Sequence, residues 1–487
     1  MVAATGLGSG IDIQGLVSGL VSAEKAPLER LLSEREADVN QTMTAFNSLQ
    51  ASLEALEDSA QLLATASTFE SKKSSSTDSE SVTASVTTSA AIADYSVDVN
   101  SLATSQSLTS SQFASHDTEV GTGTLTINFG TPTYSGLVPA NYSSFSNSTS
   151  LTSMVVNVSD GSLSGIRDAI NAKSGAVTAS ILSDGDSYRL MLTATETGIS
   201  SSISVSVTSD SDSSNTDNSG LSQLSFDAVT SNLTEIQAAS DAAFTFNGLA
   251  ITSSTNTISD LVDGVSLTLK KVTSSSETVS VSRDTVPISS ALQDLTTKYN
   301  DFIALSDELT KYDSQSGVRG VLQGDATART IISQVRRHVS EQVAGLSGDY
   351  NSLSSIGITT QQDFTLKFDI SKLNTALSSN FDDVTALLSR QSSSQSMSGI
   401  AARMDESFDA LLSSSDGVFQ ARDSILQTQV SQIADERKSL LRRLESLEAR
   451  YYRQFNAMDM LLSELSSTGE FLTQQMKNLP GTNQSKK

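Results

Sequence analysis

The sequence predicts a multidomain α+β protein in which a helical leg, built from both ends of the chain, carries two nested antiparallel β-rich head domains. Three observations predict it. Residues 418–472 carry an apolar seam at alternating steps of four and three, which is typical of a coiled coil or a long helical bundle. Residues 28–63 carry a second seam of the same kind. Between the two, apolar residues alternate with Ser, Thr or Asp, which indicates strands with one solvated face.

Residues 1–66 are expected to form a flexible segment followed by a leg helix. Glycines at the start of this segment disfavour a stable helix, and apolar residues such as Leu7, Ile11 and Leu16 suggest ordering against a partner. Pro27 suits the first turn of the leg helix. The seam of that helix consists of Leu28, Leu32, Val39, Phe46, Leu49, Leu53, Leu56 and Leu63.

The middle of the chain shows the period-two alternation of strands. The segments concerned are residues 82–86, 95–102, 124–129, 155–158, 187–193, 203–207, 243–246, 265–269 and 279–282. Turn sequences such as Asn247-Gly248 separate them, and Ser164 is expected to cap one intervening helix. This block is long enough for two domains, an inner one over 67–122 plus 240–284 and an outer one over 123–239, inserted into the first.

Helical periodicity returns after residue 285. Residues 285–417 are expected to form a helical leg domain, in which Asp325 caps the second helix and residues 364–368 form a short strand. One further helix is expected to carry Leu373, Leu377, Val384 and Leu387. Residues 418–487 then form the C-terminal coiled-coil helix and tail, whose seam consists of Leu426, Val430, Ile433, Leu440, Leu444, Leu447, Tyr451, Met458, Leu461 and Leu465.

Composition narrows the function. A net charge of −24 disfavours nucleic acid and anionic membranes as partners. The absence of Cys removes disulfides and thiolate sites, and two His residues make a histidine-rich metal site implausible. No membrane span, cleavable secretory signal, cofactor or catalytic grouping is expected. A self-assembling or partner-binding protein is therefore expected rather than an enzyme.

The seams leave two interpretations open. They form either an ordinary intramolecular bundle or a leg that also associates between copies of the protein, and their length favours the second. The candidate self-association residues are the seam and N-terminal positions Leu7, Ile11, Leu16, Leu28, Leu32, Val39, Phe46, Leu426, Val430, Ile433, Leu440, Leu444, Leu447, Tyr451, Met458, Leu461 and Leu465.

Several motifs resemble one known family. Residues 6–13 (GLGSGIDI) and 24–28 (EKAPL) resemble the N-terminus of hook-associated protein 2, the bacterial flagellar filament cap family. Residues 168–179 and 188–193 look like a repeat of flagellins and hook-associated proteins. Residues 256–269 and 452–459 are similar to later parts of the family. One departure is the turn at Asp363-Phe364, where the family has Asp-Gly.

The resemblance implies a function and partners. It implies export through the flagellar type III channel, without a cleaved signal, to the distal tip of the filament. There a ring of about five copies, closed by repeated interfaces, would retain exported flagellin and promote its folding and polymerisation, and so serve motility. The implied partners are flagellin, other copies of the chain, the hook–filament junction protein and a cytoplasmic export chaperone on the C-terminal helix.

Three other functions remain open at this stage. The Ser/Thr-rich head could make the protein a surface adhesin that binds host glycans. The chain could also be a flagellin or another hook-associated protein, against which the opening residues and end motif argue. An enzyme attached to the flagellum is the last alternative.

Overall fold

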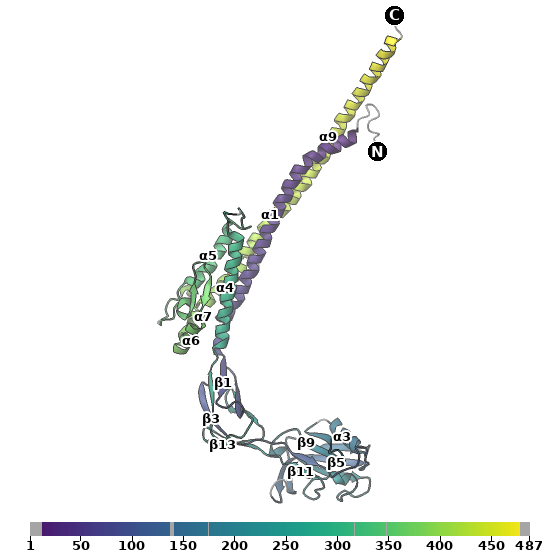
Figure 1. Cartoon of the computed structure of the whole chain (residues 1–487), viewed down its shortest axis with the longest axis vertical. Helices are drawn as coiled ribbons and strands as arrows, with labels where there is room; N and C mark the ends of the chain where they lie inside the picture. The colour runs from purple at the N-terminus through teal and green to yellow at the C-terminus, as the bar shows by residue number, and fades with distance from the viewer. Residues whose placement is uncertain (1–11, 137–140, 174, 316, 347, 478–487) are drawn as a thin grey trace. The chain divides into compact units, whose positions relative to one another are not determined.

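The computed structural model describes residues 12–136, 141–173, 175–315, 317–346 and 348–477. The chain divides into two compact units. The first combines both ends, Met1–Phe69 and Thr285–Lys487, and the second is Glu70–Asp284. The predicted α+β architecture, with long terminal helices and a β-rich insertion, is confirmed (Figure 1).

The first unit is a helical bundle. Its main helices are α1 (Ile13–Ala64), α4 (Val286–Thr310), α5 (Ala326–Ser340), α6 (Ile370–Ser379), α7 (Phe381–Ser389), α8 (Ile400–Leu412) and α9 (Val418–Lys477). α1 and α9 lie side by side (Figure 1), and α4 and α8 also pack on α1. α5 and α7 pack on α8. The shared core includes Leu53, Leu292, Tyr299, Phe302 and Phe408. The small elements are α2 (Ser67–Glu70), η3 (Leu353–Ile356), η4 (Gln395–Met397) and the hairpin of β17 (Ile358–Thr360) and β18 (Leu366–Phe368).

The start of α1 corrects the expected flexible segment from residue 13 onward, while residues 1–11 lie outside the described residues. The helix begins at Ile13, so Pro27 lies inside it rather than in its first turn. The reason is a cap: the Asp12 carboxylate accepts a hydrogen bond from Gly15 N at 2.8 Å, which satisfies an otherwise free donor of the first turn. The glycine belongs to the cap, because a Cβ at Gly15 would lie 2.3 Å from Asp12 Oδ2.

Two other helix predictions need comment. Asp325 caps α5 as expected, accepting hydrogen bonds from Thr327 N and Ala328 N. The single helix expected through Leu373 and Leu387 is wrong, because α6 and α7 separate at Asn380. Asn380 leaves the helical conformation, and its side chain accepts a hydrogen bond from Asp383 N at 3.2 Å. A residue that caps a new helix competes with continuing the old one.

The second unit contains two groups of strands with separate cores. One group comprises β1 (Lys72–Ser76), β2 (Val82–Val86), β3 (Ala93–Ser101), β12 (Ala242–Phe246), β13 (Leu249–Ser253), β14 (Thr257–Val262), β15 (Val265–Leu269) and β16 (Glu277–Arg283). Its sheets have the orders β1-β16-β3-β12-β13 and β14-β15-β2. Alternate residues face the core, as in β3, where Tyr95, Val97 and Val99 are buried.

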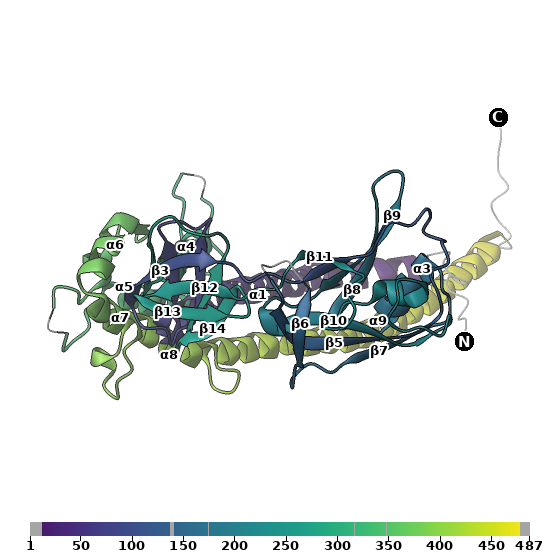
Figure 2. The same ribbon diagram turned by 90° about the horizontal axis from the view of Figure 1, so that it is seen from below.

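The other group also forms two antiparallel sheets. It comprises β4 (Ser107–Thr109), β5 (Gly123–Tyr134), β6 (Tyr142–Asn147), β7 (Met154–Val158), β8 (Val177–Ser183), β9 (Tyr188–Ala194), β10 (Ser202–Asp210) and β11 (Thr234–Gln237). β5 pairs with β10, β6 and β7 (Figure 2), and β11-β4-β9-β8 forms the second sheet. The 3₁₀ turns are η1 (Ile199–Ser201) and η2 (Gly220–Leu224). α3 (Leu163–Ala172) is capped by Ser162, not Ser164, because Ser162 Oγ accepts from Gly165 N.

The division into inner and outer head domains stays a prediction. What supports it is the separation of the buried residues into two clusters. One contains Val97, Phe244 and Val279, and the other contains Ile127 and Leu190. Each cluster draws on strands from its own group alone, so each group has a core with which to fold.

Candidate functional site: the paired terminal helices

Ion pairs set the register of α1 against α9. Arg35 and Glu436 form a two-point contact, with Nη1 to Oε2 at 2.7 Å and Nη2 to Oε1 at 3.5 Å. Glu36 meets Arg437 at 2.7 Å, and Glu24 meets Arg443 at 3.4 Å. Glu24 lies opposite Arg443, whereas Arg35, later in α1, lies opposite Glu436, earlier in α9. The two helices are therefore antiparallel. These pairs are partly exposed, so each contributes only about 0.2–1 kcal/mol, and their main effect is on register.

The base of the pair is a closed core. Phe46 of α1 meets Phe419 of α9 edge to face, with ring centroids 6.4 Å apart, and Arg422 lies over the Phe46 ring. Arg422 also pairs with Asp325, the cap of α5, at 2.6 Å. Leu49 and Leu426 are buried in the same core. This part of α9 is therefore fixed within the chain.

An acidic patch lies where α1 meets α8. Burial, and then the charges of Asp409 and Asp405, raise the pKa of Glu57 above its ordinary value. Burial and then Asp409 likewise raise the pKa of Asp405. Like charges that face each other across a helix interface oppose the packing. The patch therefore weakens the α1–α8 contact at neutral pH.

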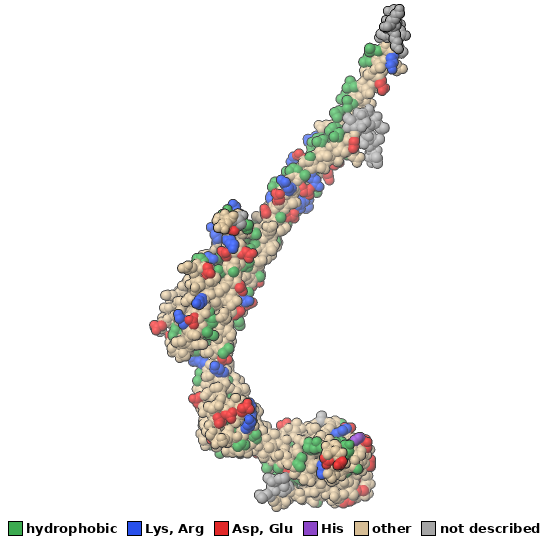
Figure 3. Space-filling view, in the orientation of Figure 1, with side chains coloured by type: hydrophobic (Ala, Val, Ile, Leu, Met, Phe, Trp, Pro, Cys, Tyr) green, Lys and Arg blue, Asp and Glu red, His purple; other side chains and the backbone are tan. Residues whose placement is uncertain are grey.

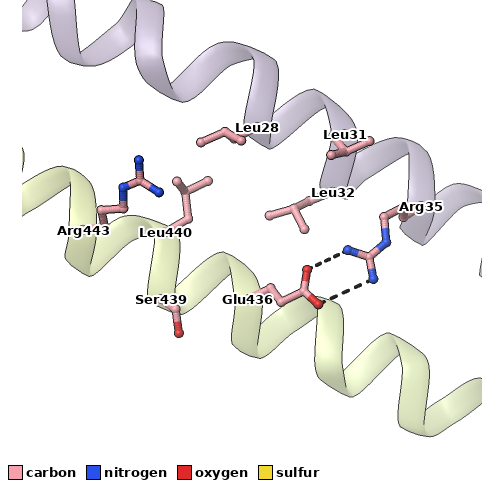
Figure 4. Close-up of a pocket in the computed structure, with 8 residues that line it drawn as sticks. All are labelled: Leu28, Leu31, Leu32, Arg35, Glu436, Ser439, Leu440 and Arg443. Carbon is pink, nitrogen blue, oxygen red and sulfur yellow. Dashed lines mark hydrogen bonds and ion pairs between the residues drawn. The ribbon is translucent and has the colours of Figure 1, made fainter.

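Further along the pair, a groove opens between the two helices. It has a volume of about 310 Å³ and is lined by Leu28, Leu31, Leu32, Arg35, Glu436, Ser439, Leu440 and Arg443. Leu28 and Leu32 project from α1 toward Leu440 on α9, and the Arg35–Glu436 pair lies at one end (Figure 4). Leu31 and the neighbouring Leu441 remain exposed. Two helices alone can each cover only one face of the other, so apolar surface stays open here.

The last part of α9 lies beyond the described part of α1. Continuing the register of the Glu24–Arg443 pair, Ile13 comes level with Gln454. After this point α9 carries exposed apolar side chains, with Met460 71% and Leu465 67% exposed. Figure 3 shows hydrophobic side chains gathered along this part of the helix. The distal stripe, as we call it, consists of Met458, Met460, Leu461, Leu462, Leu465, Phe471, Leu472 and Met476.

The predicted interface residues fall into three groups. Leu32, Phe46, Leu426, Ile433 and Leu444 are buried within the chain. Leu28, Val39, Val430, Leu440, Leu447 and Tyr451 are half-buried along the pair. Leu16, Met458, Leu461 and Leu465 are exposed. Leu7 and Ile11 lie outside the described residues. The assignment of these positions to an interface between copies stays a prediction, and the exposed group is the part available to a partner.

Some residues of the pair were not among the predicted interface residues. Glu36, Glu436 and Arg443 form the ion pairs with Arg437, Arg35 and Glu24, respectively. The sequence shows charged residues of opposite sign beside the two seams. Which of them pair follows only from the register of α1 against α9. Met460 and Leu462 flank the seam positions of the distal stripe. They mark a helix with apolar residues on more than one face, which a single seam does not describe.

The terminal helices offer surface on which a partner can bind. Across the described residues, no group of three or more His, Cys, Asp or Glu is placed to hold a metal ion. Of the helices in that same part of the chain, none has the length and apolarity of a membrane span. What the terminal helices present is a groove and an apolar stripe, and exposed apolar patches of this kind mark interaction sites.

The sequence is similar to known proteins along most of its length. Family models described as flagellar hook-associated protein 2 match residues 9–106 (N-terminus) and 239–467 (C-terminus). The flagellar hook-associated protein 2 of Escherichia coli K12 is 31% identical over 98% of this chain and 98% of its own length. The chain belongs to the flagellar hook-associated protein 2 family. The A-type member from Pseudomonas aeruginosa is 30% identical, over 98% of this chain and 97% of that protein.

A solved structure of a family member agrees. The crystal structure of the flagellar cap protein FliD D1-D2-D3 domains from Escherichia coli covers 78% of this chain and 99% of that one, with 29% identity and a TM-score of 0.57. The resemblance inferred from the motifs is thus confirmed. These relatives are hook-associated or cap proteins, which favours that function over the adhesin alternative.

Proposed function

We propose that this protein is a subunit of the cap at the distal tip of a bacterial flagellar filament. Several copies form a ring that retains exported flagellin and promotes its folding and addition to the filament. Membership of the hook-associated protein 2 family supports this, together with the likeness to a solved flagellar cap protein. The observation that carries the proposal is the distal stripe of α9, where eight large apolar side chains are exposed along one end of a helix. A concentration of exposed apolar side chains of this kind marks a surface that a partner covers.

The leg suits contacts that form and release. Covering one side chain of the distal stripe stabilises by roughly 1.5–3 kcal/mol, so a few side chains hold a subunit without locking it. The groove beside Leu28 and Leu440 adds apolar surface that no described residue fills. Because the contacts cover only part of this apolar surface, they can break and re-form as each flagellin subunit is added. The Gly-containing start of the chain is the part we assign to docking against the filament.

The finer partners follow from the same surface. Before export, an uncovered stripe would promote aggregation, so a chaperone bound to the end of α9 is part of the proposal. After export, the same residues pack against copies of the chain or against flagellin. The hook–filament junction protein is the neighbour on which the first cap assembles. A ring of about five copies, with a heterologous interface that closes, completes the proposal.

The proposal is tested by introducing two negative charges into the distal stripe. Leu461→Asp with Leu465→Asp changes residues that are already exposed, so the fold should be intact by circular dichroism. We expect short or absent filaments and flagellin released into the medium, because a charged stripe cannot be buried by a partner. Leu182→Asp is the control, since Leu182 is 47% exposed but lies in the β-rich unit. Full-length filaments from the double variant would contradict the proposal.

A further inference from the structure

A polar cavity opens to solvent at the surface of the helical bundle, on elements that the leg surface does not use. It has a volume of about 410 Å³ and lies between α5, the segment around η4, and α8. Every residue that lines it is polar or charged, including Arg337, His338, Glu341 and Arg403. Part of its wall is exposed, as at Arg337 and Ser396, whereas His338 and Arg403 are buried. The cavity therefore gives a ligand access to these two buried polar side chains.

Two of the lining side chains are buried without the partners they need. Arg403 is 3% exposed, and it donates from Nη1 to Glu341 Oε2 at 3.1 Å. In the part of the chain that the structure describes, Nε and Nη2 of Arg403 have no acceptor, and neither ring nitrogen of His338 has a partner. A buried charged donor that lacks an acceptor is costly. The arrangement is energetically incomplete without a further group.

The free atoms define the chemistry of that group. Nε and Nη2 lie on one edge of the planar guanidinium, where their two N–H groups are parallel and match the two oxygens of a carboxylate. Arg337 and Arg403 bring two positive charges against the one negative charge of Glu341. Burial keeps His338 neutral by lowering its pKa. The balance is one uncompensated positive charge, which suits a singly charged carboxylate better than a doubly charged phosphate.

We propose that this cavity is a carboxylate-binding site in which the free edge of Arg403 holds the ligand. The carboxylate comes either from an acidic side chain of a second copy or from a small free carboxylate. The first source is plausible by composition, because the chain carries 55 acidic residues against 31 basic ones. The proposal concerns a site on α5 and α8, so it stands or falls independently of the distal stripe.

The first experiment measures binding of acetate to the full-length protein by saturation-transfer difference NMR of the acetate methyl group. Arg403→Gln should reduce the transfer at least severalfold. Arg329→Gln is the matched control, because it removes the same charge from an exposed position of α5 that does not line the cavity. The control should behave as the wild type does.

A second variant protects the test against a folding defect in Arg403→Gln. Ser396 is exposed at the wall of the cavity, and Ser396→Glu supplies a carboxylate from the chain itself. This variant should lose acetate binding and unfold at a higher temperature than the wild type. Ser392→Glu, on the same loop but outside the lining, should do neither.

Light scattering then separates the two sources. If the carboxylate belongs to a second copy, Ser396→Glu and added acetate both lower the mass of the assembly. If it is a free molecule, acetate binds and the mass is unchanged. The proposal is overturned if acetate transfer is the same in wild type, Arg403→Gln and Ser396→Glu while the mass of the assembly is also the same in all three.

Discussion

At the residue scale, two positions show how single side chains decide local structure. Gly15 leaves room for the carboxylate of Asp12 that begins α1. Phe364 occupies the turn for which the family resemblance implies an Asp-Gly sequence, and its φ is 66°. A bulky residue in this left-handed region is strained. The Arg336 guanidinium lies 4.2 Å from the centre of the Phe364 ring, a contact that offsets part of the strain.

Gly15→Ala and Gly19→Ala should have different effects although both replace a glycine of α1. A Cβ at Gly19 meets no atom within 4 Å, so alanine should stabilise the helix by up to about 1 kcal/mol. At Gly15 the gain is cancelled by loss of the cap, which costs about 0.5–2 kcal/mol. Amide hydrogen exchange over residues 13–27 measures this. Equal slowing of exchange in both variants would show that Asp12 does not cap the helix.

Phe364→Gly should be more stable than Phe364→Ala, which reverses the usual order of these residues. Both variants lose the contact with Arg336, worth about 0.5–1 kcal/mol at an exposed site. Only glycine also relieves the backbone strain, by roughly 1–2 kcal/mol per residue. Urea unfolding of the two variants gives the difference directly, and an alanine variant as stable as the glycine variant would rule out strain at this turn.

At the scale of elements, periodicity predicted most of the strands that bury an apolar face, although it missed β8, and it missed elements without such a face. The segments 82–86 and 265–269 match β2 and β15; alternate residues are buried in β15, and Val82 is buried in β2. β1 (Lys72–Ser76) contains no apolar residue, so no pattern marks it, and its antiparallel pairing with β16 defines it instead. The division of α6 from α7 was missed for a similar reason, because a cap at Asn380 leaves the apolar spacing unchanged.

The candidate site was predictable in part for the same reason. Spacing identified Ile433 and Leu444 as seam residues, and both are buried. It could not show whether the covering helix belongs to the same chain or to another copy, because the two give the same pattern. In the structure Leu461 and Leu465 are exposed, so no described helix of the same chain covers them, and their coverage by another copy stays a prediction. The ion pair of Arg35 with Glu436 also needed the three-dimensional register.

The acidic patch between α1 and α8 gives a pH-dependent prediction. Folding raises the pKa values of Glu57 and Asp405, so the folded state binds protons more tightly, and these groups cost stability above their raised pKa values. Asp405→Asn removes a like-charge contact with Asp409, one helical turn away, and should stabilise by about 0.2–0.5 kcal/mol at pH 7. Asp38→Asn, at an exposed position of α1, is the control.

The sign of the effect is tested by lowering the pH. As the pH falls through the raised pKa values, the carboxyls become neutral in the wild type as well. The stability gained from Asp405→Asn should therefore shrink between pH 7 and pH 4, as measured by urea unfolding at each pH. A gain that grows toward low pH would mean that Asp405 makes a favourable ionised contact.

At the scale of the whole molecule, both ends of the chain belong to one folding unit while their apolar surface exceeds what that unit covers. α1 and α9 lie near opposite ends of the sequence, so they can pair only after the β-rich insertion between them has been synthesised. Contacts between residues so far apart in sequence are slow to form. The insertion Glu70–Asp284 is a compact unit of its own. Assembly should then depend on the terminal helices, whereas the insertion should fold without them.

Removing the distal stripe should therefore abolish association and preserve the fold. A micromolar dissociation constant corresponds to about 8 kcal/mol, and four side chains covered at roughly 1.5–3 kcal/mol each could supply this before the cost of association is counted. Deletion of residues 455–487 removes the whole stripe but leaves Leu444 and its covering helix α1 in place. We expect the full-length chain to form an assembly of several copies by light scattering and the shortened chain to be monomeric, with the same far-UV signal per residue after allowance for the lost helix.

Leu182→Asp, which changes the β-rich unit, should assemble as the wild type does. A shortened chain that still assembles would move the interface to the groove beside Leu28 or to the β-rich unit.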